Sequence, residues 1–208
     1  MFITFEGLDG SGKTTQIQLL TEFLRNQEYD VVATREPGGT AIGDQIRDIL
    51  HSLNNDEMHP RTELLLYTAS RAQLIEQVIK PHLQNHTIVL SDRFVDSTLA
   101  YQGFGHKLDL EVLRTILNFA TGGLAPDMTI YMDIPVEEGL KRRRKAADDG
   151  EEWNRLDALD FEFHKRVYAG YQALAAQEPE RWVKIDALGS EAEIQQRIQD
   201  VLLAQLKR

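Results

Sequence analysis

The chain contains no cysteine and no long run of apolar residues among its 208 residues. The absence of cysteine excludes disulfides, thiolate nucleophiles and cysteine-ligated zinc. A membrane-spanning helix needs about 18 consecutive apolar residues, and no stretch approaches that length. The N-terminus leads directly into a strand-like run, without a basic segment or a signal-like apolar region. We therefore expect a cytoplasmic protein with no membrane partner.

Basic residues are also scarce, because 23 Lys and Arg stand against 33 Asp and Glu, which gives a formal net charge of −10. An acidic surface repels long polyanions, so we expect no nucleic-acid polymer as a partner. A small phosphorylated ligand is still compatible with this composition, since a local cluster of arginines and lysines decides that case. The six histidines show no H-E-x-x-H spacing, and we expect them to be solvated or to lie on helix surfaces.

Strand-like and helix-like segments alternate along the whole chain. Apolar and β-branched runs occur at residues 2–6, 31–34, 87–91, 128–134 and 182–185. Helical periodicity fills the intervals, with a wide apolar face over residues 62–84 and a Ser190–Glu193 capping box at the start of the last helix. This alternation predicts an α/β protein in one domain, residues 1–208, whose parallel sheet is covered by helices on both faces.

The most specific motif is Gly-Leu-Asp-Gly-Ser-Gly-Lys-Thr at residues 7–14, which fits G-x-x-x-x-G-K-[ST]. It lies between the first strand and a predicted helix over residues 13–25, the order of a P-loop rather than of an ordinary glycine turn. Glycines let the backbone wrap around a phosphate, Lys13 neutralises the outer phosphates, and the Thr14 hydroxyl can bind Mg²⁺. The residues expected to hold the triphosphate are Gly7, Leu8, Asp9, Gly10, Ser11, Gly12, Lys13, Thr14 and Thr15.

Two further polar segments follow predicted strands. Residues 34–40 read Thr-Arg-Glu-Pro-Gly-Gly-Thr, and residues 90–102 read Leu-Ser-Asp-Arg-Phe-Val-Asp-Ser-Thr-Leu-Ala-Tyr-Gln. The carboxyl ends of parallel strands form the ligand crevice, so Glu36 would face it and Asp92 would orient the magnesium shell. The Arg93 guanidinium suits a phosphate. The alternatives are a plain turn with solvated charges and a helix N-cap at Asp92.

The second of these segments also offers groups that can read a base. Thr98, Tyr101 and Gln102 would lie one helical turn apart on one face. An amide beside an aromatic ring is a plausible reader of a flat heterocycle. The alternative places Tyr101 in the hydrophobic core.

A dense basic run, Lys-Arg-Arg-Arg-Lys at residues 141–145, precedes acidic residues and then Asn-Arg-Leu-Asp at residues 154–157. Consecutive helical positions point all round the helix, so two or three of the five at most can face one ligand. We interpret residues 141–157 as a mobile lid that brings arginines over the phosphates and excludes water. The alternative is solvated helix charges followed by a flexible loop.

Together these motifs resemble the thymidylate kinase (dTMP kinase) family in its bacterial form, almost from end to end. The matching segments are residues 5–15, 34–39, 61–63, 69–71, 92–102, 126–127 and 154–157. The resemblance implies a P-loop kinase fold with a parallel sheet of about five strands. It also implies phosphorylation of dTMP to dTDP with ATP and Mg²⁺, in the pathway to dTTP, and a homodimer.

The resemblance further implies a role for each matching residue. The catalytic residues would be Lys13, Asp9, Arg93 and Arg155, and Thr14 and Asp92 would hold the metal. The acceptor site would comprise Glu36, Arg47, Tyr67, Arg71, Arg93, Ser97, Thr98, Tyr101 and Gln102. Within it, Arg71 and Gln102 would bind thymine while Tyr67 stacks on the base. Arg93 and Arg47 would hold the monophosphate, and Tyr101 would favour a deoxyribose.

The chain departs from the family pattern at two aromatic positions. Tyr67 stands where the stacking residue is more usually Phe, and Phe94 stands where Tyr is frequent. The extra Tyr67 hydroxyl needs a partner, and Phe94 removes a hydroxyl together with any hydrogen bond that it made. The variable P-loop positions, residues 8–11, hold no basic residue, so the resemblance assigns the catalytic arginine to the lid, at Arg155.

Two other classes of protein are compatible with a P-loop. Another nucleoside or nucleoside monophosphate kinase would share this fold and differ in its acceptor. A non-kinase P-loop ATPase or switch would bind nucleotide without an acceptor. A guanine-specific switch typically carries Asn-Lys-x-Asp, and the sequence contains no such motif.

Overall fold

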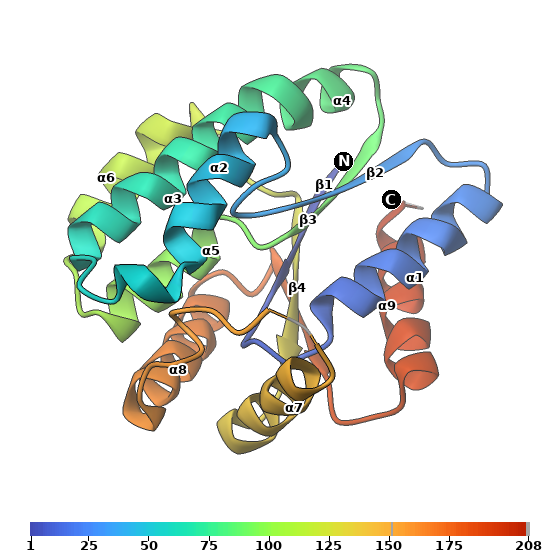
Figure 1. The fold of residues 1–208 in the computed structure, drawn as a ribbon. Coiled ribbons are helices and arrows are strands. Elements are labelled where there is room, and N and C mark those ends of the chain that lie inside the picture. Colours follow the sequence, from blue (N-terminus) through green and yellow to red (C-terminus); the bar gives the residue numbers. More distant parts are fainter. Residues whose placement is uncertain (151, 207–208) are drawn as a thin grey trace.

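The computed structural model describes residues 1–150 and 152–206, which form a central sheet with helices on both faces (Figure 1). Within these residues the sheet has five parallel strands in the order β2-β3-β1-β4-β5, so the predicted α/β fold is confirmed. The strands are β1 (Phe2–Glu6), β2 (Val31–Arg35), β3 (Ile88–Asp92), β4 (Met128–Asp133) and β5 (Trp182–Asp186). Because β1 is central, the P-loop that follows it lies at the middle of the sheet edge.

Helices cover the two faces in unequal numbers. The α-helices are α1 (Lys13–Asn26), α2 (Ala41–His51), α3 (Pro60–Leu74), α4 (Lys80–Gln84), α5 (Val95–Thr98), α6 (Leu110–Thr121), α7 (Val136–Asp148), α8 (Phe161–Gln177) and α9 (Glu191–Leu206). Short or wider turns are η1 (Leu53–Asn55), η2 (Ile75–Ile79) and η3 (Leu99–Gly105). In Figure 1, α1 and α9 lie on one side of the sheet and α2, α3, α6 and α8 on the other.

The helix expected as one element over residues 62–84 is interrupted. It comprises α3, the π-helical turn η2 and α4, and it begins at Pro60. Pro81 lacks an N–H, and its ring would crowd the carbonyl of Gln77 in a regular helix. The wider turn precedes it, where the Lys80 N–H donates to the Ile75 carbonyl. The Ser190–Glu193 capping box is confirmed, since the Ser190 N–H donates to the Glu193 carboxylate at 2.9 Å.

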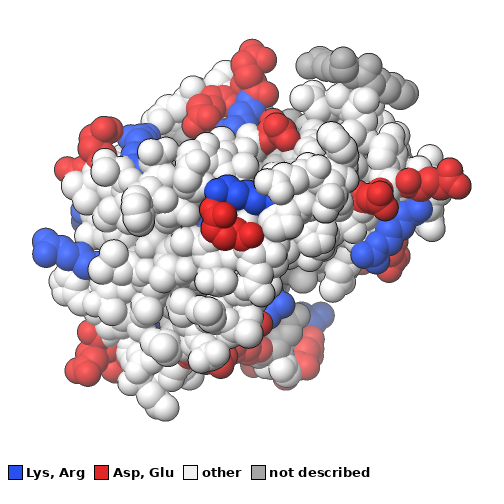
Figure 2. Space-filling model, turned by 90° about the horizontal axis from the view of Figure 1, so that it is seen from above, with Lys and Arg blue, Asp and Glu red and all other residues white. Residues whose placement is uncertain are grey.

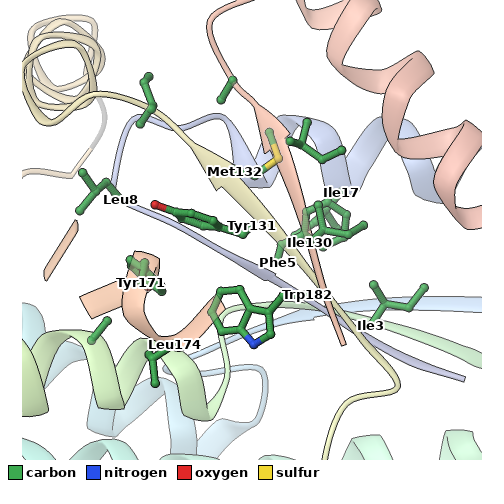
Figure 3. Packing of buried hydrophobic residues seen from close by; sticks show 14 of the residues in the cluster. Ile3, Phe5, Leu8, Ile17, Ile130, Tyr131, Met132, Tyr171, Leu174 and Trp182 are labelled. Carbon is green, nitrogen blue, oxygen red and sulfur yellow. The ribbon is translucent and has the colours of Figure 1, made fainter. Parts of the chain in front are cut away.

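The hydrophobic core fills both sides of β4 (Figure 3). The Tyr131 ring stacks on Tyr171 of α8 with 5.5 Å between ring centroids, and Trp182 packs edge-on at 5.9 Å from Tyr131. Side chains alternate along a strand, so Met132 points to the opposite face, toward Ile17 of α1. This double-sided packing fixes β4 and β1 and therefore the loop between β1 and α1.

Figure 2 shows the molecule after a 90° turn from the view of Figure 1. Acidic and basic side chains are scattered over this face, and several of them lie next to a side chain of opposite charge. No continuous basic patch is visible among the described residues on this face. No helix in the described part of the chain is both long enough and apolar enough to cross a membrane.

Candidate active site

A cleft of about 650 Å³ opens where the P-loop, the segment after β2 and the segment after β3 meet. Most of the predicted site residues line it: Asp9, Gly10, Ser11, Gly12, Lys13, Thr14, Thr15, Glu36, Arg47, Tyr67, Arg71, Asp92, Arg93, Ser97, Thr98, Tyr101 and Gln102. Three others, Gly7, Leu8 and Arg155, lie outside its wall. The parallel sheet brings these separate segments together because each follows a strand that ends at the same edge.

The P-loop has the geometry of an anion cradle. Gly7, Gly10 and Gly12 have φ angles of 138°, 78° and 87°, which suit a residue without a side chain. At Gly10 a Cβ atom would lie 2.2 Å from the Gly139 carbonyl oxygen, so the loop packs directly on the backbone of α7. The Lys13 ammonium donates to the carbonyls of Gly7 and Leu8 at 3.1 and 2.9 Å. Burial lowers the pKa of Lys13.

Thr14 and Asp92 form the predicted metal pair. The Thr14 hydroxyl donates to the Asp92 carboxylate at 2.6 Å, and both side chains line the cleft. Among the described residues no group of three or more His, Cys, Asp or Glu could hold a metal ion. Two oxygen ligands fit Mg²⁺, which keeps several waters and takes its other oxygens from nucleotide phosphates. Asp92 is not a helix N-cap, because α5 is preceded by Phe94.

Arg93 joins the P-loop to the segment that carries Ser97 and Tyr101. Its guanidinium donates to the Asp9 carboxylate at 2.6 Å and to the Ser97 hydroxyl at 2.9 Å, and it lies over the Tyr101 ring. The Tyr101 hydroxyl donates to the other Asp9 oxygen at 3.0 Å. Although burial opposes ionisation, Arg93 and Lys13 hold the pKa of Asp9 below its ordinary value. Arg93 has a φ of 73°, an unusual backbone conformation of the kind found at functional sites.

The Arg71 guanidinium is buried and donates hydrogen bonds to three neighbouring residues. Its guanidinium bonds to Glu36, to the Thr98 hydroxyl at 3.0 Å and to the Phe94 carbonyl at 2.9 Å. These hydrogen bonds use one N–H on each of the three guanidinium nitrogens, and Nη2 also forms an ion-pair contact with Glu36. Burial raises the pKa of Glu36 against the opposing effect of Arg71. No described residue accepts a hydrogen bond from the second N–H of Nη1, and Arg71 lines the cleft.

Tyr101 and Gln102 reach the cleft from a π-helical turn instead of the regular helix that their spacing predicted. Residues 99–105 form η3, in which the His106 N–H donates to the Tyr101 carbonyl. The Tyr101 ring is buried, which agrees with the alternative that placed it in the hydrophobic core. Its hydroxyl nevertheless contacts Asp9 in the cleft. The Gln102 amide donates to Glu63 at 2.6 Å. The wider turn therefore presents consecutive side chains to the same cleft.

Arginines of the predicted lid line the cleft, whereas Arg155, which the sequence favoured for catalysis, does not line it. Two members of the basic run, Arg142 and Arg143, line the cleft. This number agrees with the prediction that at most two or three of the five basic residues can face one ligand. Arg143 pairs with Asp157, and its guanidinium and that of Arg144 lie 6.0 and 5.7 Å from the Trp153 ring. Residue 151, within the predicted lid, lies outside the described residues.

Arg155 is buried and forms an ion pair with Glu63 of α3. Its backbone N–H donates to the His51 carbonyl at 3.3 Å. A role for Arg155 at the phosphates stays a prediction, and it requires the guanidinium to leave Glu63.

Several cleft residues were missed by sequence reasoning. Gln16, His51 and Glu152 line the cavity, and His51 Nδ1 lies 3.1 Å from the Glu152 carboxylate. The expectation of solvated histidines is wrong for His51 and His164, whose exposed fractions are 8% and 3%. His51 ends the amphipathic helix α2, and its position one turn after Arg47 was the available signal.

Glu6, directly before the P-loop, is a buried carboxyl whose protonation couples to folding. It accepts hydrogen bonds from the Phe94 N–H at 2.8 Å and from the hydroxyls of Ser97 and Tyr171. Burial, together with the charge of Asp96, raises the pKa of Glu6 to about 7. The folded protein therefore holds this proton more tightly than the unfolded chain does.

Replacing Glu6 with Gln is expected to flatten the pH dependence of stability. A raised carboxyl pKa makes the free energy of unfolding fall as pH rises from about 4.5 to about 7, by on the order of 3 kcal/mol. The neutral amide removes that dependence. Urea unfolding from pH 4.5 to 8 measures it, with the exposed Glu22→Gln variant as the control. Parallel pH profiles for wild type and Glu6→Gln would contradict the assignment.

The fold and the cleft define a class of protein: a P-loop phosphotransferase whose phosphate cradle faces a second pocket for a small acceptor. The thymidylate kinase family matches residues 5–198. A thymidylate kinase from Roseiflexus castenholzii is 54% identical over 196 residues, covering 90% of this chain and 86% of that protein. One from Exiguobacterium sp. is 49% identical over 208 residues, covering 100% and 96%.

A crystal structure of thymidylate kinase from Ehrlichia chaffeensis superposes with a TM-score of 0.78 at 34% identity, covering 97% of this chain and 98% of that chain. The chain belongs to the thymidylate kinase family. The predicted family, fold and enzyme class are thereby confirmed.

Proposed function

We propose that the cleft transfers the γ-phosphoryl group of ATP to the phosphate of dTMP and releases ADP and dTDP. One observation carries the proposal: Asp9 of the P-loop is bonded to Arg93 and Tyr101, so the triphosphate cradle and the acceptor pocket are one continuous site. The reaction needs both substrates side by side. This arrangement supports direct transfer between them rather than hydrolysis.

In the proposed mechanism the P-loop amides and Lys13 hold the β- and γ-phosphates. Mg²⁺, held by Thr14 and Asp92, would neutralise charge on the phosphate oxygens. Arg93 and Arg47 bind the acceptor phosphate, one oxygen of which bonds to the γ-phosphorus while the bond to the β–γ bridging oxygen breaks. The acceptor is already ionised at neutral pH, so positioning and charge stabilisation suffice without a strong general base.

The base pocket supports thymine as the heterocycle. Arg71 keeps the second N–H of Nη1 to donate, and Gln102 lines the same cleft. A donor beside an acceptor matches the C4 carbonyl and the N3–H of thymine. The ring of Tyr67 offers a stacking surface. Tyr101, fixed by Asp9, would stand close to the sugar 2′ position and favour a deoxyribose.

A coupled assay of ADP release with and without dTMP tests the proposal. We expect negligible turnover with MgATP alone and rapid turnover after dTMP is added. The same assay with dUMP, dCMP and thymidine separates this activity from related nucleotide kinases. Equal ADP release without any acceptor would support a P-loop ATPase instead and overturn the proposal. The cytoplasmic location belongs to the same proposal, since ATP and dTMP are metabolites of that compartment.

We include a homodimer in the proposal, supported by exposed apolar side chains on helices α2 and α6. α3 packs against α2 and α6, and Figure 1 shows the three side by side. Ile42 and Ile49 of α2 are 52% and 47% exposed, and Val112 and Phe119 of α6 are 55% and 90% exposed. Each pair is separated by two helical turns and therefore lies on one face. Such a surface fits a second copy of the chain.

Charged substitutions on this surface are expected to shift the protein from dimer to monomer. Phe119→Glu and Ile49→Glu would each place a charge in the proposed interface, which costs several kcal/mol when it is buried without a partner. Light scattering after size exclusion measures the mass. Leu188→Glu, at an exposed position outside these helices, is the matched control. A monomeric wild-type protein at micromolar concentration would contradict the assembly.

A further inference from the structure

Glu63 of α3 is fully buried where the base pocket meets the lid. Its Oε1 atom accepts a hydrogen bond from the Gln102 Nε2 at 2.6 Å. The same oxygen lies 3.2 Å from His106 Nε2. Its Oε2 atom pairs with the Arg155 guanidinium. One carboxylate thus touches a base-reading residue and a lid residue, although it does not line the cleft itself.

The charge state of Glu63 determines which way the Gln102 amide faces. Although burial opposes ionisation, His106 and Arg155 hold the pKa of Glu63 below its ordinary value, so the side chain is a carboxylate. A carboxylate only accepts hydrogen bonds, so Gln102 must turn its NH₂ group toward Glu63. Its carbonyl oxygen is then on the other side of the amide. No residue in the described part of the chain donates a hydrogen bond to that oxygen.

We propose that Glu63 is a positioning residue for base specificity, because it fixes the Gln102 amide with its oxygen toward the substrate base. The proposal rests on the proposed function, in which Gln102 lies against the base of the acceptor nucleotide. Together with the remaining Arg71 N–H, the fixed oxygen makes the pocket a donor beside an acceptor. Thymine and uracil present the complement, a C4 carbonyl beside an N3–H. Cytosine presents the reverse, an amino group beside an unprotonated N3, and is rejected.

The Glu63→Gln substitution would reverse this polarity. The substituted side chain has one carbonyl oxygen and one NH₂ group. While Arg155 stays on residue 63, as in the structure, it can only donate, so the new carbonyl oxygen faces Arg155 and the new NH₂ group faces Gln102. The His106 Nε2 atom, 3.2 Å from the Oε1 position that this NH₂ group takes, accepts from the same group. Gln102 then presents its own oxygen to the substituted side chain and its NH₂ group to the base. Glu63→Asp keeps an acceptor-only carboxylate and serves as the matched control.

The test is a comparison of calorimetric affinities for dTMP, dUMP and dCMP without ATP, where Arg155 stays on residue 63, and of kcat/KM for the same nucleotides, in wild type, Glu63→Gln and Glu63→Asp. We expect the ratio of dTMP to dCMP to fall by about 10- to 100-fold in Glu63→Gln, the scale of one mispaired buried hydrogen bond. It stays near the wild-type value in Glu63→Asp. The ratio of dTMP to dUMP stays unchanged in both, since the two bases share the same edge. Any effect through Arg155 acts on all three substrates and cancels in these ratios.

An unchanged dTMP-to-dCMP ratio in Glu63→Gln would overturn the inference, as would an equal fall in Glu63→Asp. If Glu63→Gln is too unstable for kinetics, calorimetric binding of dTMP and dCMP at low temperature gives the same ratio. Failure of the proposed function is separate, because it appears as wild-type protein that phosphorylates none of the three nucleotides. A merely structural role for Glu63 lowers all activities together and leaves the ratios fixed.

Discussion

Replacing Arg155 with Lys is expected to lower kcat by about 10³-fold while the KM for dTMP changes little. In the proposed mechanism the Arg155 guanidinium leaves Glu63 and stabilises the charge on the transferring phosphoryl group. A lysine ammonium lacks the planar fork that contacts two phosphate oxygens at once. Initial rates at saturating ATP with varied dTMP separate kcat from KM.

The lysine variant is preferable to alanine because Arg155 also has a structural partner. Arg155→Ala would leave the buried Glu63 carboxylate without its cation, at a cost of about 3 kcal/mol in the free energy of unfolding. Arg155→Lys retains a positive charge near Glu63, so thermal unfolding should stay close to that of wild type. Arg144→Lys, outside the cleft wall, is the matched control for kcat. Wild-type kcat in Arg155→Lys would show that another lid residue, such as Arg143, serves the transfer.

Replacing Lys13 with Met is expected to lower kcat/KM by about 10³-fold and, in the same variant, to raise the melting temperature by a few degrees. Lys13 is 6% exposed and forms no ion pair with any described residue. Its ammonium donates to loop carbonyls, and burial lowers its pKa. Folding therefore desolvates this charge without a direct ion pair, although Asp9 and Asp92 attract it, and a methionine of similar length removes the larger desolvation cost.

Lys13→Met is expected to lower activity and raise stability, and this combination distinguishes a phosphate-binding charge from a residue that only packs. A residue that served only packing would lose activity and stability together, whereas a charge held ready for phosphate loses activity alone. Calorimetry without nucleotide gives the stability, and the coupled assay gives the activity. Lys165→Met, at an exposed lysine of α8, should leave both near wild type. A lower melting temperature in Lys13→Met would contradict the argument.

The fold and the phosphate cradle were predictable because their signals are local. The segment from Phe2 to Thr14 carries a strand, the glycines and the Lys-Thr pair in an order that few other structures require. The two π-helical turns were not predictable, because η2 and η3 differ from regular helices by one hydrogen-bond register and leave the apolar periodicity nearly intact. Strand ends were off by one residue where polar Arg35 and Asp92 continue the ladder.

The interior of the site was harder to predict because it depends on contacts between distant segments. The Arg155–Glu63 pair joins residues 92 positions apart, and no spacing rule relates them. The family resemblance predicts Arg155 at the phosphates, and the sequence could not show that its guanidinium pairs with the buried Glu63 carboxylate. His51 was likewise predicted to be solvated, because the sequence does not show that the end of α2 lies beside Glu152.

Trp153 gives the lid an optical signal of its own. The chain has two tryptophans, and the other, Trp182, is buried in β5 beside Tyr131. Trp153 is half-buried and lies under the Arg143 and Arg144 guanidiniums. Indole emission responds to the nearby charge and water, so a rearrangement of these arginines changes the fluorescence of Trp153 while Trp182 stays a constant background. The predicted movement of residues 141–157 can therefore be tested by stopped-flow fluorescence in the unlabelled enzyme, separately from the chemical step.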